Sequence, residues 1–467
     1  MGSGIPHSAL TQSAMMPRLV IHNLGHLVTM NPIREILTNA YIVIQDGVIV
    51  LLGSGHPLVQ PGDEQVDARG GIALPGLINT HHHLFQNLAR AYTPIANASL
   101  FPWIEGLLPM FRGLNHEDLF LATQVGLAEL MLSGCTLCAD HHYLFPRATA
   151  YGLMGAGFEA AKIMGCRYVA CRGSVQSSAA RADDWMGESI NEILGDCQRL
   201  HDQYHQSGPG GMLGLALAPG SIFSGDQTLF RESSRLARSL GLGLHTHLGE
   251  VPEESDICLK HLGERPVDLL KRYEWEGERV WLAHGIHFSD QEIAQLGSMR
   301  VGVAHCPCCN MRMGSGVCRV QALTDAGVTI SLGVDGSASN DSGHMLNEVR
   351  LALFLTRVVH GAASMTVDRA LEMATLGGAK NLGRLSDLGS LEVGKRGDIA
   401  IFPAEDIWSN GAENPVHGLI YCHPRNVQTL VVEGRVRVRD GRLVGIDLED
   451  LLARHRKSAH RLQQSKR

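Results

Sequence analysis

Residues 74–86 read Leu74-Pro75-Gly76-Leu77-Ile78-Asn79-Thr80-His81-His82-His83-Leu84-Phe85-Gln86. The apolar run predicts a buried strand that ends in three consecutive histidines. Because residues two apart on a strand face the same side, His81 and His83 can bind one metal ion while His82 points into the wall. Histidine is the commonest metal ligand, but surface tracts also contain tandem histidines, so the remaining ligands must come from elsewhere in the chain.

The middle of the chain, residues 75–384, alternates short apolar runs with helical stretches such as residues 118–132 and 230–240. This alternation is typical of a parallel sheet. Eight candidate strands end near His83, Asp140, Arg172, Pro219, His247, His284, His305 and Asp335. Eight strand–helix units in about 310 residues predict a (β/α)8 TIM-like barrel, whose active site forms where the strands end. A doubly wound sheet would gather ligand-binding residues from fewer strands.

Both ends of the chain have a different pattern, with short β-branched runs separated by turn residues, including a hairpin signal at Asp46-Gly47. We therefore expect one small β-sandwich built from residues 17–74 and 385–446. Residues 1–16 have neither the basic segment nor the apolar core of a signal peptide and are expected to be a disordered extension. Residues 447–467 are expected to form a C-terminal helical tail.

The composition excludes several classes of protein. A net charge of −7 gives the protein no positive field that could bind nucleic acid. The chain contains no run of about 18 apolar residues, so no membrane-spanning helix is expected. Eleven scattered cysteines do not resemble a disulfide framework, so a reducing cytoplasm is the expected compartment. The close groups Cys135/Cys138 and Cys306/Cys308/Cys309 lie in or beside apolar runs, where free cysteine packs as a small hydrophobe. Neither nucleic acid nor a membrane is therefore an expected partner.

Four residues at strand ends form the candidate metal site: His81 and His83 on the first strand, His247 on the fifth and Asp335 on the eighth. Three imidazoles and one carboxylate with an open position make a catalytic zinc-type site. His245 lies one pleat deeper than His247, and we interpret it as a packed, hydrogen-bonded residue of the barrel.

Two further residues are candidates for proton transfer. Glu250 follows His247 by three positions, which places a carboxyl at the mouth of the pocket; the alternative is a solvated loop glutamate, since Glu253 and Glu254 follow closely. His284 can orient or deprotonate a water at the metal. His305, on the neighbouring strand, has no clear assignment and is compatible with a structural role.

Several motifs together resemble the amidohydrolase superfamily over nearly the whole chain. They are residues 74–83, His247-Leu248-Gly249-Glu250, Leu282-Ala283-His284-Gly285, Gly333-Val334-Asp335-Gly336-Ser337-Ala338-Ser339-Asn340 and residues 387–395. The resemblance implies a metal-dependent barrel with a composite sandwich, the four ligands named above, and proton handling by His284 and Glu250. Two-metal members carry a carboxylated lysine on strand four, whereas this strand ends Ala216-Leu217-Ala218-Pro219-Gly220-Ser221. One divalent metal per chain is therefore expected, Zn²⁺ in the first place, although Fe²⁺ occupies related sites.

Within that superfamily, residues 305–312 and 335–341 resemble 8-oxoguanine deaminases. Hydroxydechloroatrazine ethylaminohydrolases share the histidine triplet and residues 246–250 in similar form, and isoxanthopterin and guanine deaminases are also similar. Cys309 stands where many relatives have serine, and Gly249 where alanine is more common. The resemblance implies hydrolytic deamination of an amino-substituted N-heterocycle, with 8-oxoguanine first, by a protein whose relatives are commonly homo-oligomers. A non-catalytic metal-binding barrel would be expected to lack a ligand or Glu250, and all are present.

Four residues are candidates for contacts with the substrate. The resemblance implies that Gln86 contacts the substrate ring, and its amide can donate and accept hydrogen bonds. Trp103, in Phe101-Pro102-Trp103, offers a ring for stacking or belongs to a hydrophobic turn that caps the barrel. Tyr143 and Arg172 can meet carbonyl oxygens of the ring; Arg172 can instead pair with a carboxylate of the barrel.

Overall fold

The central element of the computed structural model, which describes residues 17–174, 185–223 and 226–464, is a closed parallel barrel of eight strands. In chain order the strands are β6 (Leu77–Asn79), β7 (Cys135–His142), β8 (Arg167–Ser174), β9 (Leu213–Pro219), β10 (Gly243–Leu248), β11 (Val280–His284), β12 (Gly302–His305) and β13 (Ile330–Leu332). The barrel closes where Leu332 of β13 pairs with Asn79 of β6. The expected (β/α)8 fold is confirmed, and each of the eight predicted runs contains a strand, although β6 and β13 end before the predicted His83 and Asp335.

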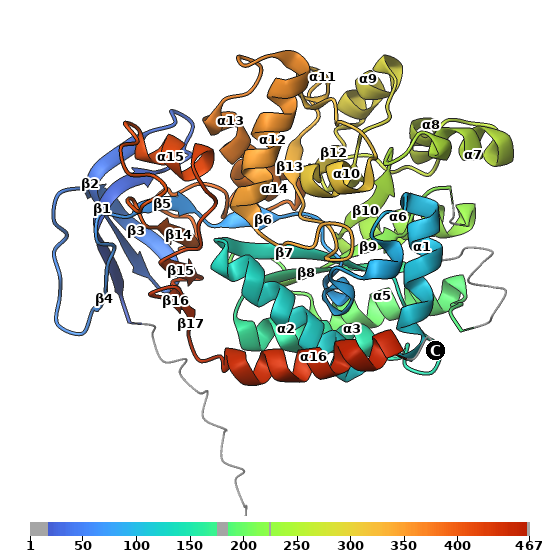
Figure 1. The fold of residues 1–467 in the computed structure, drawn as a ribbon, viewed down its shortest axis with the longest axis horizontal. Coiled ribbons are helices and arrows are strands. Elements are labelled where there is room, and N and C mark those ends of the chain that lie inside the picture. Colours follow the sequence, from blue (N-terminus) through green and yellow to red (C-terminus); the bar gives the residue numbers. More distant parts are fainter. Residues whose placement is uncertain (1–16, 175–184, 224–225, 465–467) are drawn as a thin grey trace, which may run out of the picture.

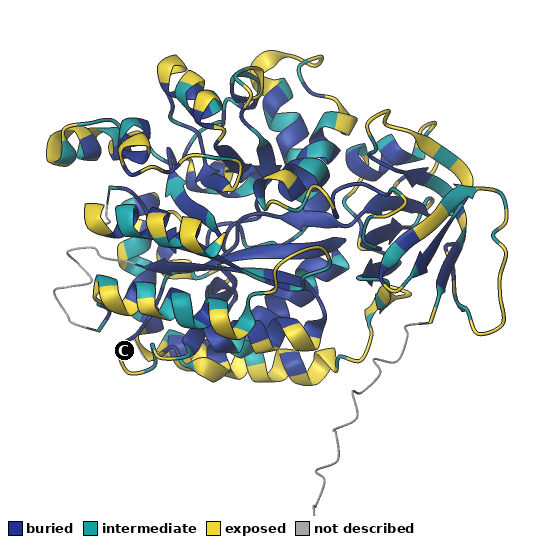
Figure 2. Cartoon of the chain, turned by 180° about the vertical axis from the view of Figure 1, so that it is seen from behind, coloured by how far each residue is buried: buried dark blue, intermediate teal, exposed yellow. Residues whose placement is uncertain are grey.

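Helices surround the barrel (Figures 1 and 2). They include α2 (His116–Leu132), α3 (Leu153–Met164), α5 (Ile190–Tyr204), α6 (Gln227–Leu240), α7 (Glu253–Leu262), α8 (Pro266–Arg272), α9 (Asp290–Met299), α10 (Pro307–Met313), α11 (Val320–Asp325), α12 (Met345–His360), α13 (Val367–Glu372) and α14 (Gly378–Asn381). In α6 the buried side chains Leu229, Phe230, Ser233, Ser234 and Ala237 recur at the helical period, which gives the helix its single inner face.

Strands from both chain ends form a second, nine-stranded sheet beside the barrel (Figure 1). It contains β1 (Leu19–Val28), β2 (Ile36–Gln45), β3 (Val48–Ser54), β4 (Glu64–Asp67), β5 (Ile72–Pro75), β14 (Ile399–Phe402), β15 (Thr429–Val432), β16 (Arg435–Arg439) and β17 (Arg442–Leu443). The two ends meet where β5 pairs antiparallel with β14. A separate core, which includes Leu19, Ile42 and Ile399, lies within this sheet. The hairpin predicted at Asp46-Gly47 is confirmed, with positive φ at both residues (50° and 76°).

One residue connects the small sheet to the barrel. β5 ends at Pro75 and β6 begins at Leu77, so Gly76 alone passes the chain from one to the other. A Cβ at Gly76 would lie 2.2 Å from Oγ1 of Thr136, so only glycine fits this close approach. A bidentate ion pair between Arg167 of β8 and Asp398, with both contacts at 2.8 Å, further joins the two units.

The C-terminal helix α16 (Leu448–Gln464) lies along α2 (Figure 1). Arg461 pairs with the buried Asp118 of α2, and Gln463 donates to the carbonyl of Leu88 in the 3-10 helix η1 (Leu84–Ala89). The segment that follows the triple histidine is therefore packed against the end of the chain. The prediction for residues 1–16 falls outside the described residues. Within the described ranges, none of the helices combines the length and the apolar character that a membrane span requires.

Candidate active site

The triple histidine begins two residues beyond the end of a strand rather than inside it. β6 stops at Asn79, and residues 80–83 continue in extended form against β13. The amide of Thr80 donates to the carbonyl of Leu332 (3.0 Å), and the amide of Asp335 donates to the carbonyl of His81 (3.0 Å). His82 is fully buried, and its Nδ1 accepts from the backbone amide of His83. The predicted alternation of side chains at His81, His82 and His83 therefore continues past the end of β6, because hydrogen bonds to β13 and the residues after it hold this segment in place.

The four predicted metal ligands come together at the C-terminal end of the barrel. Oδ1 of Asp335 lies 3.3 Å from Nε2 of His81 and 3.2 Å from Nε2 of His83. Nε2 of His83 also lies 3.1 Å from Nε2 of His247. Side chains from the first, fifth and eighth strands thus direct one donor atom each into the same small volume.

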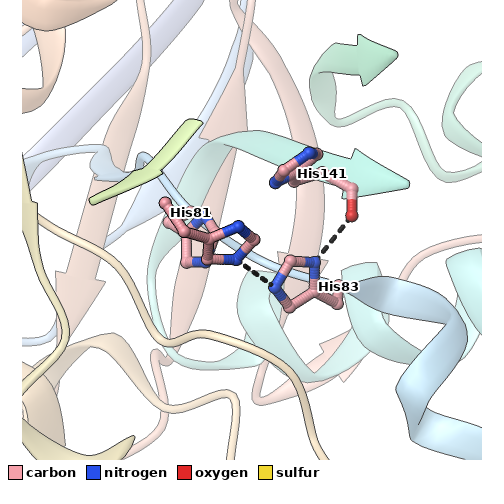
Figure 3. A group of neighbouring side chains, drawn as sticks. His81, His83 and His141 are labelled. Atoms are coloured by element: carbon pink, nitrogen blue, oxygen red, sulfur yellow. Dashed lines mark hydrogen bonds between the residues drawn. The ribbon is translucent and has the colours of Figure 1, made fainter. Parts of the chain in front are cut away.

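Backbone carbonyls orient two of these imidazoles. Nδ1 of His83 lies 2.6 Å from the carbonyl oxygen of His141, and Nδ1 of His247 lies 2.7 Å from that of Gly220. Figure 3 shows one ring nitrogen of His83 directed at this oxygen and the other side of the ring close to His81. Because a carbonyl only accepts, each Nδ1 carries the proton, and each neutral ring presents the Nε2 lone pair to the centre.

His81 is oriented by another histidine. Its Nδ1 lies 2.8 Å from Nε2 of His245, whose own Nδ1 lies 2.8 Å from the carbonyl of Trp281. The carbonyl keeps the proton of His245 on Nδ1, so His245 accepts from His81 and leaves Nε2 of His81 with its lone pair. The interpretation of His245 as a packed, hydrogen-bonded residue is confirmed, and its hydrogen bond goes to a candidate ligand.

These donors fit a divalent cation. Burial lowers the pKa of His81 and of His247 well below the ordinary histidine value, so both rings are neutral. Unprotonated nitrogens and a carboxylate oxygen 3.1–3.3 Å apart repel one another unless a cation lies between them. Zinc bonds of about 2.0–2.1 Å place the donors of a tetrahedral site roughly 3.3 Å apart, which matches this spacing.

His141 is a neighbour of the site that the sequence analysis did not select. One of its ring nitrogens lies within 4.8 Å of the donor atoms of His81, His83 and His247. Nε2 of His141 bonds to the carbonyl of Ala218 at 2.7 Å, while its backbone oxygen orients His83. The sequence could have identified His141, because Asp140-His141-His142 lies at the end of β7, just as the other candidate histidines lie near strand ends.

Glu250 and His284 lie together beside the candidate ligands. Oε2 of Glu250 is 3.5 Å from Nε2 of His284, which is 4.0 Å from Oδ2 of Asp335. Nδ1 of His284 lies 3.0 Å from Oδ1 of Asn310, a contact that the sequence analysis did not identify. Glu250 is only 6% exposed, so the alternative of a solvated loop glutamate is wrong. Burial, together with the charge of Asp335, raises the pKa of Glu250 to about 8.

Two of these side chains are positioned by unusual backbone conformations. His284 has φ of 75° and Asp335 has φ of 62°. Non-glycine residues in this left-handed region cost on the order of 1–3 kcal/mol each and persist where surrounding structure holds them. His284 ends β11 and Asp335 follows β13, so two of the chain's positive-φ residues lie at the candidate site.

A cavity of about 250 Å³ opens onto the candidate ligands. One wall is apolar and contains Leu100, Phe101, Trp103, Ile104, Leu108, Phe223 and Met313; the opposite wall contains polar side chains, among them Tyr143, Glu250, His284, Asp335 and Ser339. Trp103 and Tyr143, two of the predicted substrate contacts, therefore line this cavity. Nε1 of Trp103 donates to the carbonyl of Ala338 at 3.1 Å, which fixes the indole ring.

The other two predicted substrate contacts do not line the cavity. Nε2 of Gln86 donates to the hydroxyl of Tyr143 at 3.2 Å, so Gln86 lies behind Tyr143. Arg172 is buried, pairs with Glu188 and Asp196, and places its guanidinium 3.9 Å from the ring centre of Phe145. Of the two alternatives for Arg172, the structure therefore supports the ion pair, because Glu188 and Asp196 already bind the guanidinium.

His305 and the three cysteines that follow it are packed rather than paired. His305 is buried, and burial lowers its pKa to about 3. All eleven cysteines of the chain lie in the described residues and are free. Cys306 and Cys309 are buried and Cys308 is partly exposed. The prediction that these cysteines form no disulfide framework is confirmed.

Comparison with known proteins decides the family. The model of the amidohydrolase family matches residues 72–437. The chain belongs to the amidohydrolase family. An 8-oxoguanine deaminase from Pseudomonas aeruginosa is 44% identical to this amidohydrolase over 426 residues, which cover 90% of this chain and 94% of the relative. A hydroxydechloroatrazine ethylaminohydrolase from Pseudomonas sp. (strain ADP) is 36% identical, with coverage of 91% and 92%.

Solved structures agree with this assignment. An atrazine chlorohydrolase from Arthrobacter aurescens, crystallised with zinc, superposes on the amidohydrolase with a TM-score of 0.90. The two sequences are 33% identical, and the match covers 94% of this chain and 100% of the chlorohydrolase. As the sequence predicts, β9 of this amidohydrolase contains no lysine that could bridge two metal ions.

Proposed function

We propose that this amidohydrolase is a metal-dependent hydrolytic deaminase of an amino-substituted N-heterocycle, and that its substrate is 8-oxoguanine, converted to urate and ammonia. The convergence of three imidazole Nε2 atoms and Asp335 beside the Glu250–His284 pair carries this proposal. The relative with 44% identity, named 8-oxoguanine deaminase, supports the choice of substrate.

His81, His83, His247 and Asp335 would hold one divalent cation, for which zinc is the best candidate. A cation bound there is a Lewis acid that lowers the pKa of water to about 7 and so supplies hydroxide at neutral pH. Zinc is favoured by the histidine and carboxylate donors and by the zinc in the related chlorohydrolase crystal. Metal analysis of protein purified without added metal tests this part: near one equivalent per chain is expected, and two would overturn it.

The side chains around the cation handle the protons. Asp335 accepts a proton from the attacking water through Oδ2, and His284, held by Asn310, orients that water. Glu250 donates a proton to the ring nitrogen beside the attacked carbon, because its raised pKa keeps the carboxyl protonated at neutral pH. Asp335 then returns its proton to the departing amine, and ammonia leaves as a neutral molecule. The hydroxyl proton of the adduct passes to the Glu250 carboxylate, which leaves the product carbonyl and restores the protonated Glu250.

The cavity provides the substrate contacts. A planar heterocycle can pack against the indole of Trp103 while the hydroxyl of Tyr143, which accepts from Gln86, donates its own proton to a ring oxygen or nitrogen. Arg172 is left out of this proposal because its guanidinium is paired with carboxylates.

A second candidate substrate class is an N-alkylated hydroxytriazine, from which an alkylamine would leave. The apolar wall formed by Leu100, Phe101, Ile104, Leu108, Phe223 and Met313 favours it, since an alkyl group would contact that wall. Isoxanthopterin and guanine are further alternatives. An alternative function of a different class is a barrel that binds metal but catalyses no reaction.

The experiment is a release assay across these rings. Ammonia and alkylamine are measured with 8-oxoguanine, guanine, isoxanthopterin, cytosine and hydroxylated amino-triazines at equal concentration. We expect the highest kcat/KM for 8-oxoguanine. A higher value for a triazine would replace the substrate, and no release from any ring would overturn the deaminase proposal.

We also propose that the protein acts in the cytoplasm as a homo-oligomer. The free cysteines support a reducing compartment, and the relatives that the sequence resembles are commonly oligomers. Light scattering of the purified protein at several concentrations measures the mass of the particle in solution. The mass of a monomer at every concentration would contradict the proposed homo-oligomer.

A further inference from the structure

A second group of donor atoms lies beside the four candidate ligands. Glu250, His284 and Cys309 each offer one atom, and these atoms all lie within 4.8 Å of one another. All three residues are buried. They come from three separate parts of the barrel's end: the loop after β10, the end of β11 and helix α10.

The geometry of His284 leaves a nitrogen available to this group. Its Nδ1 faces Oδ1 of Asn310, so the proton lies on Nδ1 and the lone pair of Nε2 faces Oε2 of Glu250 at 3.5 Å. A nitrogen lone pair opposite a carboxyl oxygen, with a thiol close to both, is the arrangement that a metal ion can bridge.

We propose that Glu250, His284 and Cys309 form a second, inhibitory site for a zinc-like divalent cation. Thiolate, imidazole and carboxylate are the three donor types that zinc prefers. Donors of a tetrahedral zinc site lie roughly 3.3–3.7 Å apart, and these three donor atoms already lie within 4.8 Å of one another. The nearby carboxylate oxygen Oδ2 of Asp335, 4.0 Å from Nε2 of His284, adds negative charge that favours a cation.

This site differs from the first one in composition and in strength. The first site has four donors, none of them sulfur, and hydrogen bonds fix its imidazoles from behind. The second site has three donors, one fewer than the first. The second site therefore fills only after the first, when metal is in excess.

Occupation of the second site blocks the reaction, an effect that rests on the proposed deaminase function. Glu250 and His284 both line the cavity, so a cation between them occupies space that the substrate needs. The cation also binds the carboxyl of Glu250, which donates the proton to the substrate ring. Inhibition is therefore competitive with the heterocycle, and a bound substrate excludes the second cation.

Cobalt provides a test that needs no turnover. Protein with one zinc per chain is titrated with Co²⁺, and bound metal is measured by equilibrium dialysis. We expect a second equivalent to bind and a thiolate-to-cobalt charge-transfer band to appear in the near ultraviolet. The first site cannot produce this band because it contains no sulfur.

Two matched variants complete the test. Cys309→Ser is expected to lose the band and to bind the second equivalent at least tenfold more weakly. Cys308→Ser, on the same helix, is expected to keep both the band and the second equivalent. Absence of a second equivalent in the unmodified protein, or a band that persists in Cys309→Ser, would overturn the site. Both readouts are spectroscopic or equilibrium measurements, so the second metal site can be tested even if the protein deaminates none of the rings.

The inhibition is measured separately. Excess Zn²⁺ should raise the KM of the unmodified enzyme and of Cys308→Ser, and should affect Cys309→Ser at least tenfold less. Equal inhibition of all three proteins would show that excess zinc acts elsewhere and would remove the inhibitory role.

Discussion

Nε2 of His245 lies 2.8 Å from Nδ1 of His81 and accepts its proton, and His245 itself donates to the carbonyl of Trp281. This chain of two hydrogen bonds decides which nitrogen of His81 faces the candidate metal. The imidazole of His245 also stacks on the indole of Trp281 at 4.7 Å. His245 therefore positions a ligand without being one.

Replacing His245 with phenylalanine should weaken metal binding. The ring stack on Trp281 is retained, but His81 loses its hydrogen-bond acceptor, and loss of such a partner typically costs about 10–100-fold in metal affinity. Competition with a coloured zinc chelator measures the change. His305→Phe, which removes a buried histidine of β12, two strands away in the barrel, is the control and should bind metal normally. Equal affinity in both variants would contradict the role of His245.

Replacing Glu250 with glutamine should slow the reaction without releasing the metal. A positioned proton donor typically contributes about 10²–10⁴-fold to the rate, so kcat should fall within this range. Steady-state kinetics and metal analysis of the same sample give both values. Glu253→Gln, an exposed neighbour, should keep full activity. Full turnover by Glu250→Gln would reject Glu250 as the donor.

The activity should decline on the alkaline side of neutrality. Burial and the charge of Asp335 raise the pKa of Glu250 to about 8, so the carboxyl is protonated at pH 7 and loses its proton as the pH rises past 8. Since the protonated form donates, kcat should fall about tenfold per pH unit above that value. The residual activity of Glu250→Gln should lack this decline. An identical alkaline limb in the variant would assign it to another group.

Replacing Tyr143 with phenylalanine should weaken substrate binding. The hydroxyl, which is fixed by Gln86, is lost while the ring stays in the cavity wall. A neutral hydrogen bond contributes about 0.5–1.5 kcal/mol, so KM should rise by up to about tenfold with little change in kcat. Initial rates over a range of substrate concentrations separate the two. An unchanged KM would remove Tyr143 from the contacts.

Replacing Arg172 with methionine should affect stability rather than recognition. The buried guanidinium pairs with Glu188 and Asp196, and breaking a buried ion pair costs about 3–5 kcal/mol. We expect a value near 3 kcal/mol, because both carboxylates reach solvent. Thermal unfolding measures it, and KM of the folded variant should be unchanged. A large rise in KM with normal stability would restore Arg172 as a substrate contact.

The sequence alone predicted the fold and most of the candidate site for one physical reason. In a parallel barrel all strands end at the same face, so His81, His83, His247 and Asp335 must meet once the strands are recognised. The apolar runs and their spacing made the strands recognisable. The composite second sheet followed from the same reasoning, because its strands share a β-branched pattern at both chain ends.

Only the tertiary structure could decide how the side chains are used. The carbonyls of His141 and Gly220 orient two ligands, and every residue has a carbonyl, so no residue type marks them in the sequence. Arg172 ends a strand like a functional residue, but carboxylates from a later segment pair with it. Cys309 resembles any packed cysteine until its neighbours are known. Strand ends follow from local pattern, whereas partners depend on contacts between distant segments, and these form only when the barrel closes.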